Sequence, residues 1–394
     1  MSNTKLFGIT GSPISKSLSP EIWNSAFEKY NIDAVYLRLC VGSMDEALSF
    51  AKELGLKALN VTSPFKQDVN LELGAVNSVI FKKDDSLEYL NTDVEGFLRS
   101  YNDIKYRPEL PALVLGAGGA ARSAVLALKK AGAKNISLAN RTKNKAEKLC
   151  AEYGLDLLEW EKVNNDLKDK YNIFSCISSN NVLDTPFDSN YYKTDFGKRW
   201  LCYQAQSLFK RFYDHEPFEV MSQALNRAVN EKKKKTSIAL VGFMGAGKSL
   251  IAKGLSSKLG YDLVDLDLLI EQREGHSISD IFANKGEQYF REVEKEVLIG
   301  LNLDRPMVLA TGGGVVTDAK NTEYLSKNFT VVWLWASFSS ICVRVQSTDR
   351  PLFKDGLVQE LFDKRKPLYA KVSDLCVNNS CCDQQEIVDL IIKN

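Results

Sequence analysis

The stretch TSIALVGFMGAGKSLIAKGL, residues 236–255, combines a short apolar run, a glycine-rich turn that ends in Lys-Ser, and the start of a helical pattern. The segment Gly242–Ser249 fits G-x-x-x-x-G-K-[ST], and a strand before it and a helix after it are the context that this motif requires. We expect the backbone N–H groups of the loop to surround the phosphates of a nucleotide. Lys248 would reach the β- and γ-phosphate oxygens, and the Ser249 hydroxyl would coordinate Mg²⁺.

Residues downstream of the loop indicate what could accept a phosphoryl group. Asp265 and Asp267 end an apolar run, and side chains two apart on an extended strand share a face, so we expect both to point into one site. One carboxylate can serve Mg²⁺ and the other a substrate hydroxyl. A bare strand end that a small ligand can approach closely is formed by Gly312, Gly313 and Gly314. The cations that could hold an anionic acceptor are Arg291, Arg350 and Arg365.

The composition is that of an ordinary globular protein. The chain has 394 residues, of which 44% are hydrophobic and 26% charged, and its formal net charge of +1 argues against a broad nucleic-acid or membrane surface. No apolar run approaches the roughly 20 residues of a membrane span, and the N-terminus has no signal-peptide pattern. Eight cysteines without a C-x-x-C motif and only two histidines indicate a reduced setting without a His-based zinc site. We expect a cytoplasmic monomer or homodimer whose partners are small molecules.

A second glycine turn lies upstream, in ALVLGAGGAARSAVLALKKAG (112–132), between an apolar run and a helical pattern. It matches G-x-G-x-x-G/A, the dinucleotide fingerprint, through Gly116, Gly118 and Ala121. The loop residues expected to contact the cofactor are Gly116, Ala117, Gly118, Gly119 and Ala120. Where NAD-binding proteins carry an acidic residue, at the end of the next expected strand, this chain has Asn140, Arg141 and Thr142, with Lys145 one turn on. A cation and a hydroxyl suit a 2′-phosphate, so NADP(H) is favoured over NAD.

Polar residues at expected strand ends and turns precede this fingerprint, in GITGSPISKSLSPEIWN, LNVTSPFK, GAVNSVIF and YLNTDVEGF. Such groups suit a polyhydroxylated substrate. Hydride addition to a carbonyl creates an alkoxide that must gain a proton, and Lys66, held by Asp93, could stabilise that charge and supply the proton. The alternative is that Lys66 and Asp93 form a surface ion pair worth less than ~1 kcal/mol.

Short apolar runs alternate with helical patterns along almost the whole chain, which predicts an α/β fold with largely parallel sheets. The Lys run in NRAVNEKKKKTSI (226–238) is interpreted as a solvated linker at a domain boundary. The Pro-containing polar segment after residue 100 indicates another boundary. We expect a substrate-binding lobe over 1–100, to which a helix at about 215–231 returns, a Rossmann lobe over 101–214, a linker at 232–236, and a P-loop kinase domain over 237–394.

The second half of the chain resembles shikimate kinase. The stretches GFMGAGKS, DLDLLIEQREGHSISDIFANKGEQYFREVE, TGGGVV, RPL and KRKPLY follow that family's order and spacing over residues 237–394. The resemblance implies a shikimate site made of Asp267, Arg291, Gly312, Gly313, Gly314 and Arg365. It implies Mg²⁺ ligands Ser249 and Asp265, catalytic Lys248, Asp267 and a lid residue Arg350, and an ATP site that includes Gly245, Ala246, Gly247, Ser249 and Leu250. Leu250 stands where the family usually has Thr, and the lid segment after Arg344 is slightly short.

The first half resembles shikimate dehydrogenase over about residues 4–231. The motifs that carry this resemblance are SKSLSP, NVTSPFK, GAVN, NTD and NRTKNKA. It implies that Lys66 and Asp93 are the catalytic pair and that the substrate contacts are Ser17, Ser19, Asn60, Thr62, Asn77, Tyr203 and Gln223. The segment between Lys66 and Gly74 is about ten residues shorter than the family usually has, and the patterns near 173–207 are blurred.

The two resemblances involve the same metabolite, shikimate. Together they imply a bifunctional enzyme of the shikimate (aromatic amino acid) pathway that reduces 3-dehydroshikimate to shikimate with NADPH and then phosphorylates shikimate to shikimate 3-phosphate with MgATP. One alternative, motivated by the short segment after Lys66, is an active kinase with a decayed dehydrogenase domain that binds ligand or scaffolds. Others are a metabolite-sensing regulator built from retired enzyme domains, and a first domain that prefers quinate.

Overall fold

The computed structural model describes residues 4–67, 75–104, 106–177, 194–230, 235–345, 358–380 and 383–394. The chain divides into two compact units, and each is described by itself. Unit 1 comprises Met1–Ser17, Asp33–Leu56 and Lys233–Asn394, and unit 2 comprises Leu18–Ile32 and Lys57–Lys232. The domain boundaries expected from the sequence stay a prediction.

Unit 1 contains a parallel sheet with the strand order β11-β12-β10-β13-β14-β2-β1. Its strands are β1 (Lys5–Thr10), β2 (Ala34–Cys40), β10 (Ser237–Val241), β11 (Asp262–Asp265), β12 (Met307–Ala310), β13 (Phe329–Trp335) and β14 (Leu375–Asn378). The central strands β10, β12 and β13 are buried along nearly their whole length, which suits apolar runs such as SIALV and MVLA, because helices cover both faces of a parallel sheet. The expected parallel α/β fold is therefore confirmed for this unit.

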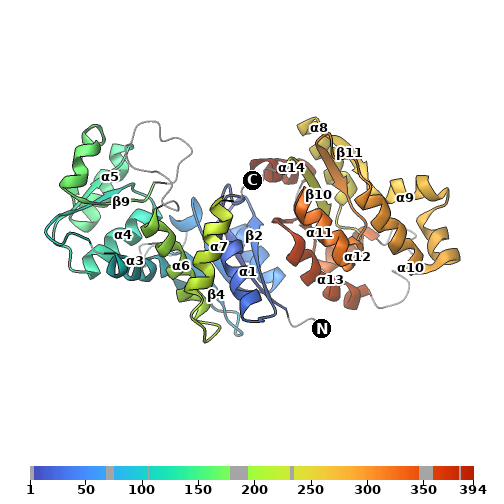
Figure 1. The fold of residues 1–394 in the computed structure, drawn as a ribbon, viewed down its shortest axis with the longest axis horizontal. Helices are drawn as coiled ribbons and strands as arrows, with labels where there is room; N and C mark the ends of the chain where they lie inside the picture. Colours follow the sequence, from blue (N-terminus) through green and yellow to red (C-terminus); the bar gives the residue numbers. More distant parts are fainter. Residues whose placement is uncertain are drawn as a thin grey trace. The chain divides into compact units, whose positions relative to one another are not determined.

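Helices surround this sheet (Figure 1). They are α2 (Met44–Leu54), α8 (Lys248–Leu259), α9 (Leu266–Glu274), α10 (Ile278–Ile299), α11 (Ala319–Asn328), α12 (Phe338–Val345), α13 (Val358–Val372) and α14 (Gln384–Lys393). The order β10, glycine loop, α8 is the strand–loop–helix that the opening stretch predicts. Helix α10 is kinked at Gly286 (φ 80°, ψ 170°), so its second part has its own direction.

Unit 2 contains an antiparallel group β3-β4-β5 and a parallel sheet with the order β8-β7-β6-β9. The strands are β3 (Leu56–Val61, whose first residue is counted with unit 1), β4 (Ser78–Phe81), β5 (Leu87–Leu90), β6 (Ala112–Leu115), β7 (Ile136–Ala139), β8 (Asp156–Leu157) and β9 (Asn172–Ser175). The parallel sheet is the expected dinucleotide-binding architecture. The β4–β5 pair departs from the parallel trend because the short connection between these strands permits only a hairpin, and β3 is also antiparallel to β4.

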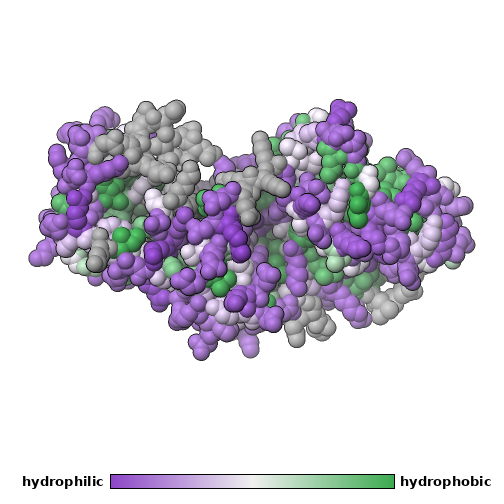
Figure 2. All heavy atoms as spheres, in the orientation of Figure 1, coloured by the Kyte–Doolittle hydropathy of each residue, from purple (hydrophilic) through white to green (hydrophobic). Residues whose placement is uncertain are grey.

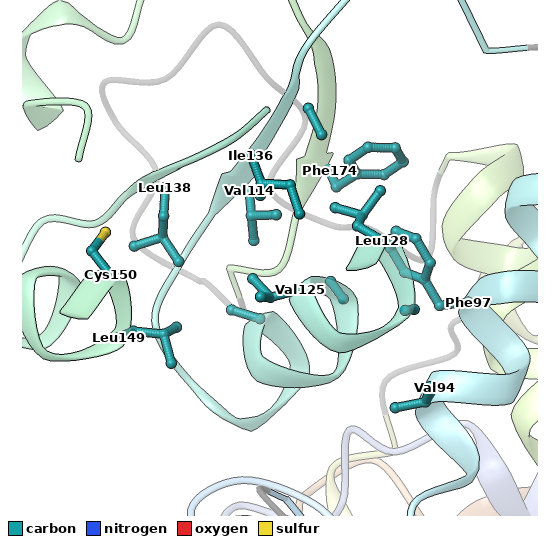
Figure 3. Close-up of a cluster of buried hydrophobic side chains, with 14 of the residues drawn as sticks. Val94, Phe97, Val114, Val125, Leu128, Ile136, Leu138, Leu149, Cys150 and Phe174 are labelled. Carbon is teal, nitrogen blue, oxygen red and sulfur yellow. The ribbon is translucent and has the colours of Figure 1, made fainter. Parts of the chain in front are cut away.

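The helices of unit 2 are α1 (Ser19–Lys29), α3 (Thr92–Asp103), α4 (Gly119–Lys130), α5 (Lys143–Tyr153), α6 (Asp195–Phe209) and α7 (Phe218–Asn230). Helix α7 packs beside α1, and α3 packs along α6 (Figure 1). The apolar core around the parallel sheet joins α3 to the dinucleotide fold, because Phe97 of α3 packs with Val114, Leu128 and Phe174 (Figure 3).

The hydropathy of the surface and the burial of the cysteines agree with the composition of an ordinary globular protein. On the face shown in Figure 2, hydrophilic residues predominate and apolar residues lie in small groups. Among the described residues, no helix is long and apolar enough to cross a membrane. Cys40, Cys150, Cys202 and Cys376 are buried free thiols, as expected for cysteines that act as small apolar core residues.

Gly96 marks the closest approach of α3 and α6, and its replacement tests this packing. A Cβ at Gly96 would lie 2.6 Å from the backbone nitrogen of Gln204. We expect Gly96→Ala to lower the free energy of unfolding by about 1–3 kcal/mol through overpacking, although Ala favours a helix by about 1 kcal/mol. Denaturant unfolding of the full chain, followed by tryptophan fluorescence, measures the change.

The neighbouring variant Glu95→Ala is the control. Glu95 Oε1 makes only an exposed i,i+4 ion pair with Arg99 Nη2 at 2.9 Å, so we expect a loss below about 0.5 kcal/mol. Equal effects of the two substitutions would contradict the close approach at Gly96.

Candidate active sites

The phosphate loop of unit 1 has the turn that its motif requires. Gly245 (φ 77°) and Gly247 (φ 86°) adopt the left-handed backbone that glycine reaches without steric cost. Lys248 begins α8, and its Nζ donates to the carbonyl oxygens of Gly242 at 2.9 Å and Phe243 at 3.1 Å. The ammonium group therefore lies inside the loop, where the phosphates of a nucleotide are expected.

Ser249 and Asp265, the expected Mg²⁺ ligands, lie together. Ser249 Oγ donates to Asp265 Oδ2 at 2.8 Å. Asp265 Oδ1 accepts from the N–H groups of Asp267 at 3.1 Å and Leu268 at 3.4 Å. One hydroxyl and one carboxylate fit Mg²⁺, which keeps several waters and binds substrate phosphates.

Asp265 and Asp267 do not share an extended strand, so that expectation is wrong. Strand β11 ends at Asp265, and Asp267 lies in the first turn of α9. The helix starts early because the Asp265 carboxylate caps its free N–H groups. Asp267 still reaches the expected acceptor site, since a Cβ at Gly312 would lie 2.9 Å from its Oδ1.

The arginines expected at the acceptor site converge on the bare backbone of Gly312–Gly314. A Cβ at Gly314 would lie 2.5 Å from Arg291 Cζ, so the guanidinium lies directly against this glycine. Arg365 Nη1 donates to the carbonyl oxygen of Gly313 at 3.3 Å, and the Tyr369 hydroxyl donates to the same oxygen. The structure thus brings together Asp267, Arg291, Arg365 and the three glycines.

Glu294 belongs to this site and was missed in the sequence. It is fully buried, and its Oε2 accepts from Arg291 Nη1 at 2.8 Å. A Cβ at Gly312 would lie 2.8 Å from Glu294 Oε1. Burial raises the pKa of Glu294, and the nearby Arg291 guanidinium opposes that rise. The available signal was the spacing of Arg291 and Glu294, which places residues three apart on one helix face.

Two buried atoms in this pocket have no hydrogen-bond partner among the described residues, namely Glu294 Oε1 and Arg365 Nε. The first is an acceptor and the second a donor. An unmet buried polar group costs about 1–3 kcal/mol, so both atoms destabilise the site as it stands.

On the nucleotide side, the roles of Arg350 and Leu250 remain predictions. Arg350 lies outside the described residues, as does the rest of the expected lid. Leu250 lies in the first turn of α8 with an exposed side chain, and its carbonyl oxygen accepts from Gln384 Nε2 at 3.0 Å.

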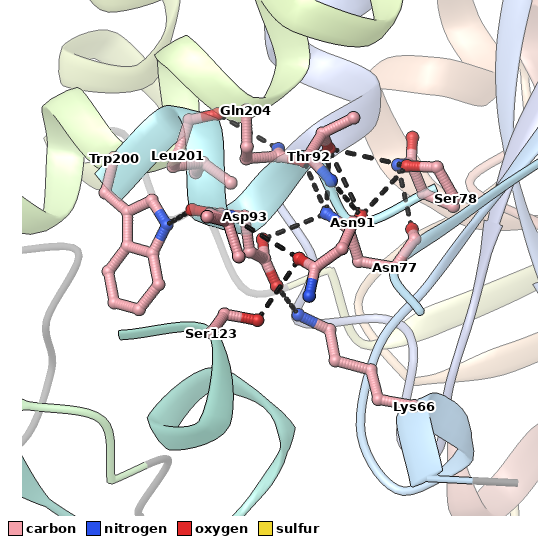
Figure 4. A network of polar contacts seen from close by, with 12 residues as sticks. Lys66, Asn77, Ser78, Asn91, Thr92, Asp93, Ser123, Trp200, Leu201 and Gln204 are labelled. Atoms are coloured by element: carbon pink, nitrogen blue, oxygen red, sulfur yellow. Dashed lines mark hydrogen bonds and ion pairs between the residues drawn. The ribbon is translucent and has the colours of Figure 1, made fainter. Parts of the chain in front are cut away.

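Lys66 and Asp93 form a hydrogen-bonded ion pair in unit 2 (Figure 4). Their side chains are 15% and 10% exposed, so the alternative that they form a surface ion pair is wrong. Asp93 Oδ1 accepts from Asn77 Nδ2 at 3.0 Å, and the Asp93 carbonyl oxygen accepts from Trp200 Nε1 at 2.8 Å. These contacts fix the carboxylate, which in turn holds the lysine ammonium at the site.

Asn77 connects the ion pair to a buried polar network (Figure 4). Its Nδ2 donates to Thr92 Oγ1 at 2.9 Å, and its Oδ1 accepts from the Thr92 N–H at 2.8 Å. Asn60 Nδ2 donates to the Asn77 carbonyl oxygen at 3.1 Å and to Ser78 Oγ at 2.8 Å. The expected substrate residues Asn60 and Asn77 are therefore brought beside Lys66 and Asp93.

Gln204 joins this network and was missed in the sequence. Among the described residues, neither Tyr203 nor Gln223 is hydrogen-bonded to this network. Gln204 is buried, and its Oε1 accepts from Asn77 Nδ2 at 3.3 Å. The Tyr203 hydroxyl instead donates to Asp103, at the opposite end of α3 from Asp93, and its ring stacks on Phe218. Burial raises the pKa of Tyr203 to about 12, and the Asp103 carboxylate adds to the rise. Gln223 is exposed on α7. The substrate roles of Tyr203 and Gln223 stay predictions.

The other expected substrate contacts are placed as follows. Ser19 is buried at the start of α1, and Thr62 is partly exposed after β3 with its carbonyl oxygen accepting from the Phe65 N–H at 3.0 Å. Ser17 belongs to unit 1, where its carbonyl oxygen accepts from Arg38 Nη2 at 2.6 Å. Their roles stay predictions.

The dinucleotide loop of unit 2 lies between β6 and α4 and contacts the ion pair. Gly116 adopts φ 114°, and a Cβ at Gly119 would lie 2.9 Å from Lys66 Cβ. The lysine stem therefore packs on backbone that carries no side chain. Cys176 lies beside this loop, and burial raises the pKa of its thiol to about 12, with Asp93 adding to the rise and Lys66 opposing it.

The residues expected to bind a 2′-phosphate follow β7 directly. Asn140 Nδ2 donates to the Thr142 carbonyl oxygen at 3.0 Å, which folds the turn before α5. The side chains of Arg141, Thr142 and Lys145 are exposed at this turn. An exposed cation next to a hydroxyl fits a phosphate monoester at the end of the strand.

Family models match both halves of the chain. The model described as shikimate kinase matches residues 244–394. The model described as shikimate dehydrogenase substrate binding domain matches residues 9–79, and that described as shikimate / quinate 5-dehydrogenase matches residues 105–191.

Relatives divide in the same way. A shikimate kinase from Persephonella marina is 40% identical over 159 residues, which are 40% of this chain and 96% of that protein. A shikimate dehydrogenase (NADP(+)) from Caldanaerobacter subterraneus subsp. tengcongensis is 42% identical over 165 residues, 39% of this chain and 58% of that protein. The structure of a quinate dehydrogenase from Corynebacterium glutamicum in complex with NAD superimposes with a TM-score of 0.50 at 21% identity, over 57% of this chain and 99% of that one. That last likeness shows the fold alone.

Proposed function

We propose that this chain, which belongs to the shikimate kinase family and carries the domains of the shikimate dehydrogenase family ahead of its kinase domain, catalyses two consecutive steps of the shikimate pathway. The first is NADPH-dependent reduction of 3-dehydroshikimate to shikimate. The second is MgATP-dependent phosphorylation of shikimate to shikimate 3-phosphate. The observation that carries the kinase assignment is the convergence of Asp267, Arg291 and Arg365 on the bare backbone of Gly312–Gly314, beside the phosphate loop motif.

In the kinase site, each group has a separate task. Arg291 and Arg365 would hold the substrate carboxylate, and Glu294 would accept a substrate hydroxyl. Asp267 would accept the proton of the attacking hydroxyl. Ser249 and Asp265 would bind the Mg²⁺ of MgATP, which supplies the phosphoryl group, and Lys248 would move from its loop carbonyls to the phosphate oxygens.

In the dehydrogenase site, NADPH supplies a hydride to the carbonyl carbon of 3-dehydroshikimate. The carbonyl oxygen then gains a proton, and Lys66 is the group placed to give it. Asp93 would hold the ammonium in its orientation. Asn60 and Asn77 would bind the other hydroxyls. The choice of NADP(H) over NAD rests on the exposed Arg141 after β7.

The burial and hydrogen bonding of the Lys66–Asp93 pair disfavour the decayed-domain alternative. A site without function has no reason to keep a largely buried ion pair in a polar network. The segment 68–74, whose shortness motivated that alternative, lies outside the described residues. A cytoplasmic location, a monomeric or homodimeric state, and shikimate rather than quinate as the substrate remain predictions.

A coupled assay on the intact protein tests the proposal. With 3-dehydroshikimate, NADPH and MgATP supplied, we expect NADPH oxidation together with shikimate 3-phosphate. Oxidation without phosphorylated product would refute the kinase half, and phosphorylation of added shikimate without NADPH oxidation would refute the dehydrogenase half. The reverse assay with NADP⁺ and either shikimate or quinate measures the substrate preference.

Variants of the two lysines separate the activities and control for each other. Lys66→Ala should lower dehydrogenase turnover about 10²–10⁴-fold, through loss of the proton donor, and leave phosphorylation of added shikimate unchanged. Lys248→Ala should abolish phosphorylation and leave NADPH oxidation unchanged. A Lys66→Ala protein that still reduces 3-dehydroshikimate at the wild-type rate would show that the ion pair is not catalytic.

Removing the charge of Glu294 tests the acceptor pocket. Glu294→Gln keeps the volume but leaves Arg291 without its buried partner, so we expect the KM for shikimate to rise roughly 10- to 100-fold. The KM for ATP should change little, because Glu294 contacts no part of the phosphate loop in the described structure. Steady-state kinetics with each substrate varied in turn measures both values.

Glu287→Gln is the matched control, since Glu287 Oε1 pairs with the same Arg291 at 3.1 Å but its side chain is 57% exposed. Solvent screens that pair, so we expect less than a threefold change in KM. Similar effects of the two variants would contradict the special role of the buried partner.

A further inference from the structure

The carbonyl oxygens of the phosphate loop accept hydrogen bonds from three side chains. Lys248 Nζ, inside the loop, reaches the carbonyls of Gly242 and Phe243. Arg344 Nη1 reaches that of Gly245 at 3.4 Å, and Asn379 Nδ2 reaches that of Ala246 at 2.7 Å. An anion-binding loop needs this arrangement, because its N–H groups can converge on phosphate only while its carbonyls turn away.

These donors differ in whether they can stay when a nucleotide binds. Lys248 leaves its two carbonyls if its ammonium is to contact phosphate oxygens. Asn379 can keep its contact, because its amide is not needed at the phosphate oxygens. It follows β14, it is 7% exposed, and its backbone is held by the N–H that donates to the Trp335 carbonyl oxygen at 2.7 Å.

Asn379 also sets the shape of the neighbouring turn. A Cβ at Gly247 would lie 2.8 Å from Asn379 Nδ2, so the amide packs against the left-handed glycine that precedes Lys248. Arg344 holds the backbone of Asn379 and Ser380. Its Nη2 donates to the carbonyl oxygens of Asn379 at 2.7 Å and Ser380 at 3.1 Å. The arginine thus joins α12, the end of β14 and the loop.

We propose that Asn379 is a positioning residue for the kinase reaction, which holds the Ala246 carbonyl outward and keeps the phosphate loop preformed for the β- and γ-phosphates of ATP. Arg344 secures the backbone of Asn379 for this task. The inference rests on the proposed kinase function for its kinetic consequence. Nothing in the loop motif points to Asn379, which lies over a hundred residues downstream.

Asn379→Asp tests this role with almost no change of shape. The substitution turns the donor that faces the Ala246 carbonyl into an acceptor, so the two oxygens repel each other. We expect the Kd of MgADP, measured by calorimetry on the full chain, to rise roughly 10- to 100-fold. The Kd of adenosine, which has no phosphate, and that of shikimate should change less than about twofold, which a general loss of structure would not allow. In turnover, the KM for ATP should rise while the KM for shikimate stays the same.

Asn378→Asp is the matched control. Asn378 Oδ1 accepts from the Ser380 N–H at 2.9 Å, a role that a carboxylate keeps, and the variant adds the same charge one residue away. We expect MgADP to bind within about threefold of wild type. An equal loss in both variants would assign the effect to charge alone and overturn the proposal.

Two further outcomes are decisive. If Asn379→Asp weakens the binding of adenosine and of MgADP equally, Asn379 acts on the base or on folding, and the proposal is wrong. If the aspartate variant does not fold, the smaller and neutral variant Asn379→Ser repeats the test. If wild type binds MgADP but does not phosphorylate shikimate, the proposed kinase function fails, while a selective loss of MgADP affinity in Asn379→Asp still supports the positioning role.

Discussion

Both sites depend on one packing constraint, which is that a cationic side chain lies directly against glycine backbone. In unit 1 the Arg291 guanidinium occupies the space that a Cβ at Gly314 would need, and in unit 2 the Lys66 stem does the same at Gly119. A larger residue at either glycine would require the cationic side chain to shift from its place. The glycine-rich stretches therefore do more than approach phosphate, because they also set where the charge of each site lies.

Placing charge so deep in the protein requires a partner for every group. Asp93 has Lys66 on one oxygen and Asn77 on the other, and Glu294 has Arg291 on one oxygen. Where the pairing is complete, the network is rigid and positions a proton donor. Where it is incomplete, as at Glu294 Oε1 and Arg365 Nε, the unmet groups carry a desolvation cost.

How far the sequence predicts these sites depends on how local the contact is. Strand, glycine loop and helix are neighbours in the chain, so the loop and Lys248 could be placed from the motif alone. Asp267 was assigned to a strand because a side-chain cap, Asp265, ends the strand two residues earlier than the apolar pattern does. Tyr203 and Gln204 are adjacent on α6, and one residue turns a helix by about 100°, so only Gln204 faces the Asn77 network.

Glu294 was missed although its partner Arg291 is local, but two other missed contacts have partners far away in the sequence. Gln204 meets Asn77, and Asn379 meets Ala246, across more than a hundred residues each. Such pairs are set by how strands are ordered in a sheet, which no local pattern encodes. The described kinase groups lie within unit 1 and the Lys66–Asp93 network within unit 2, so no catalytic side chain among the described residues is shared by the two networks.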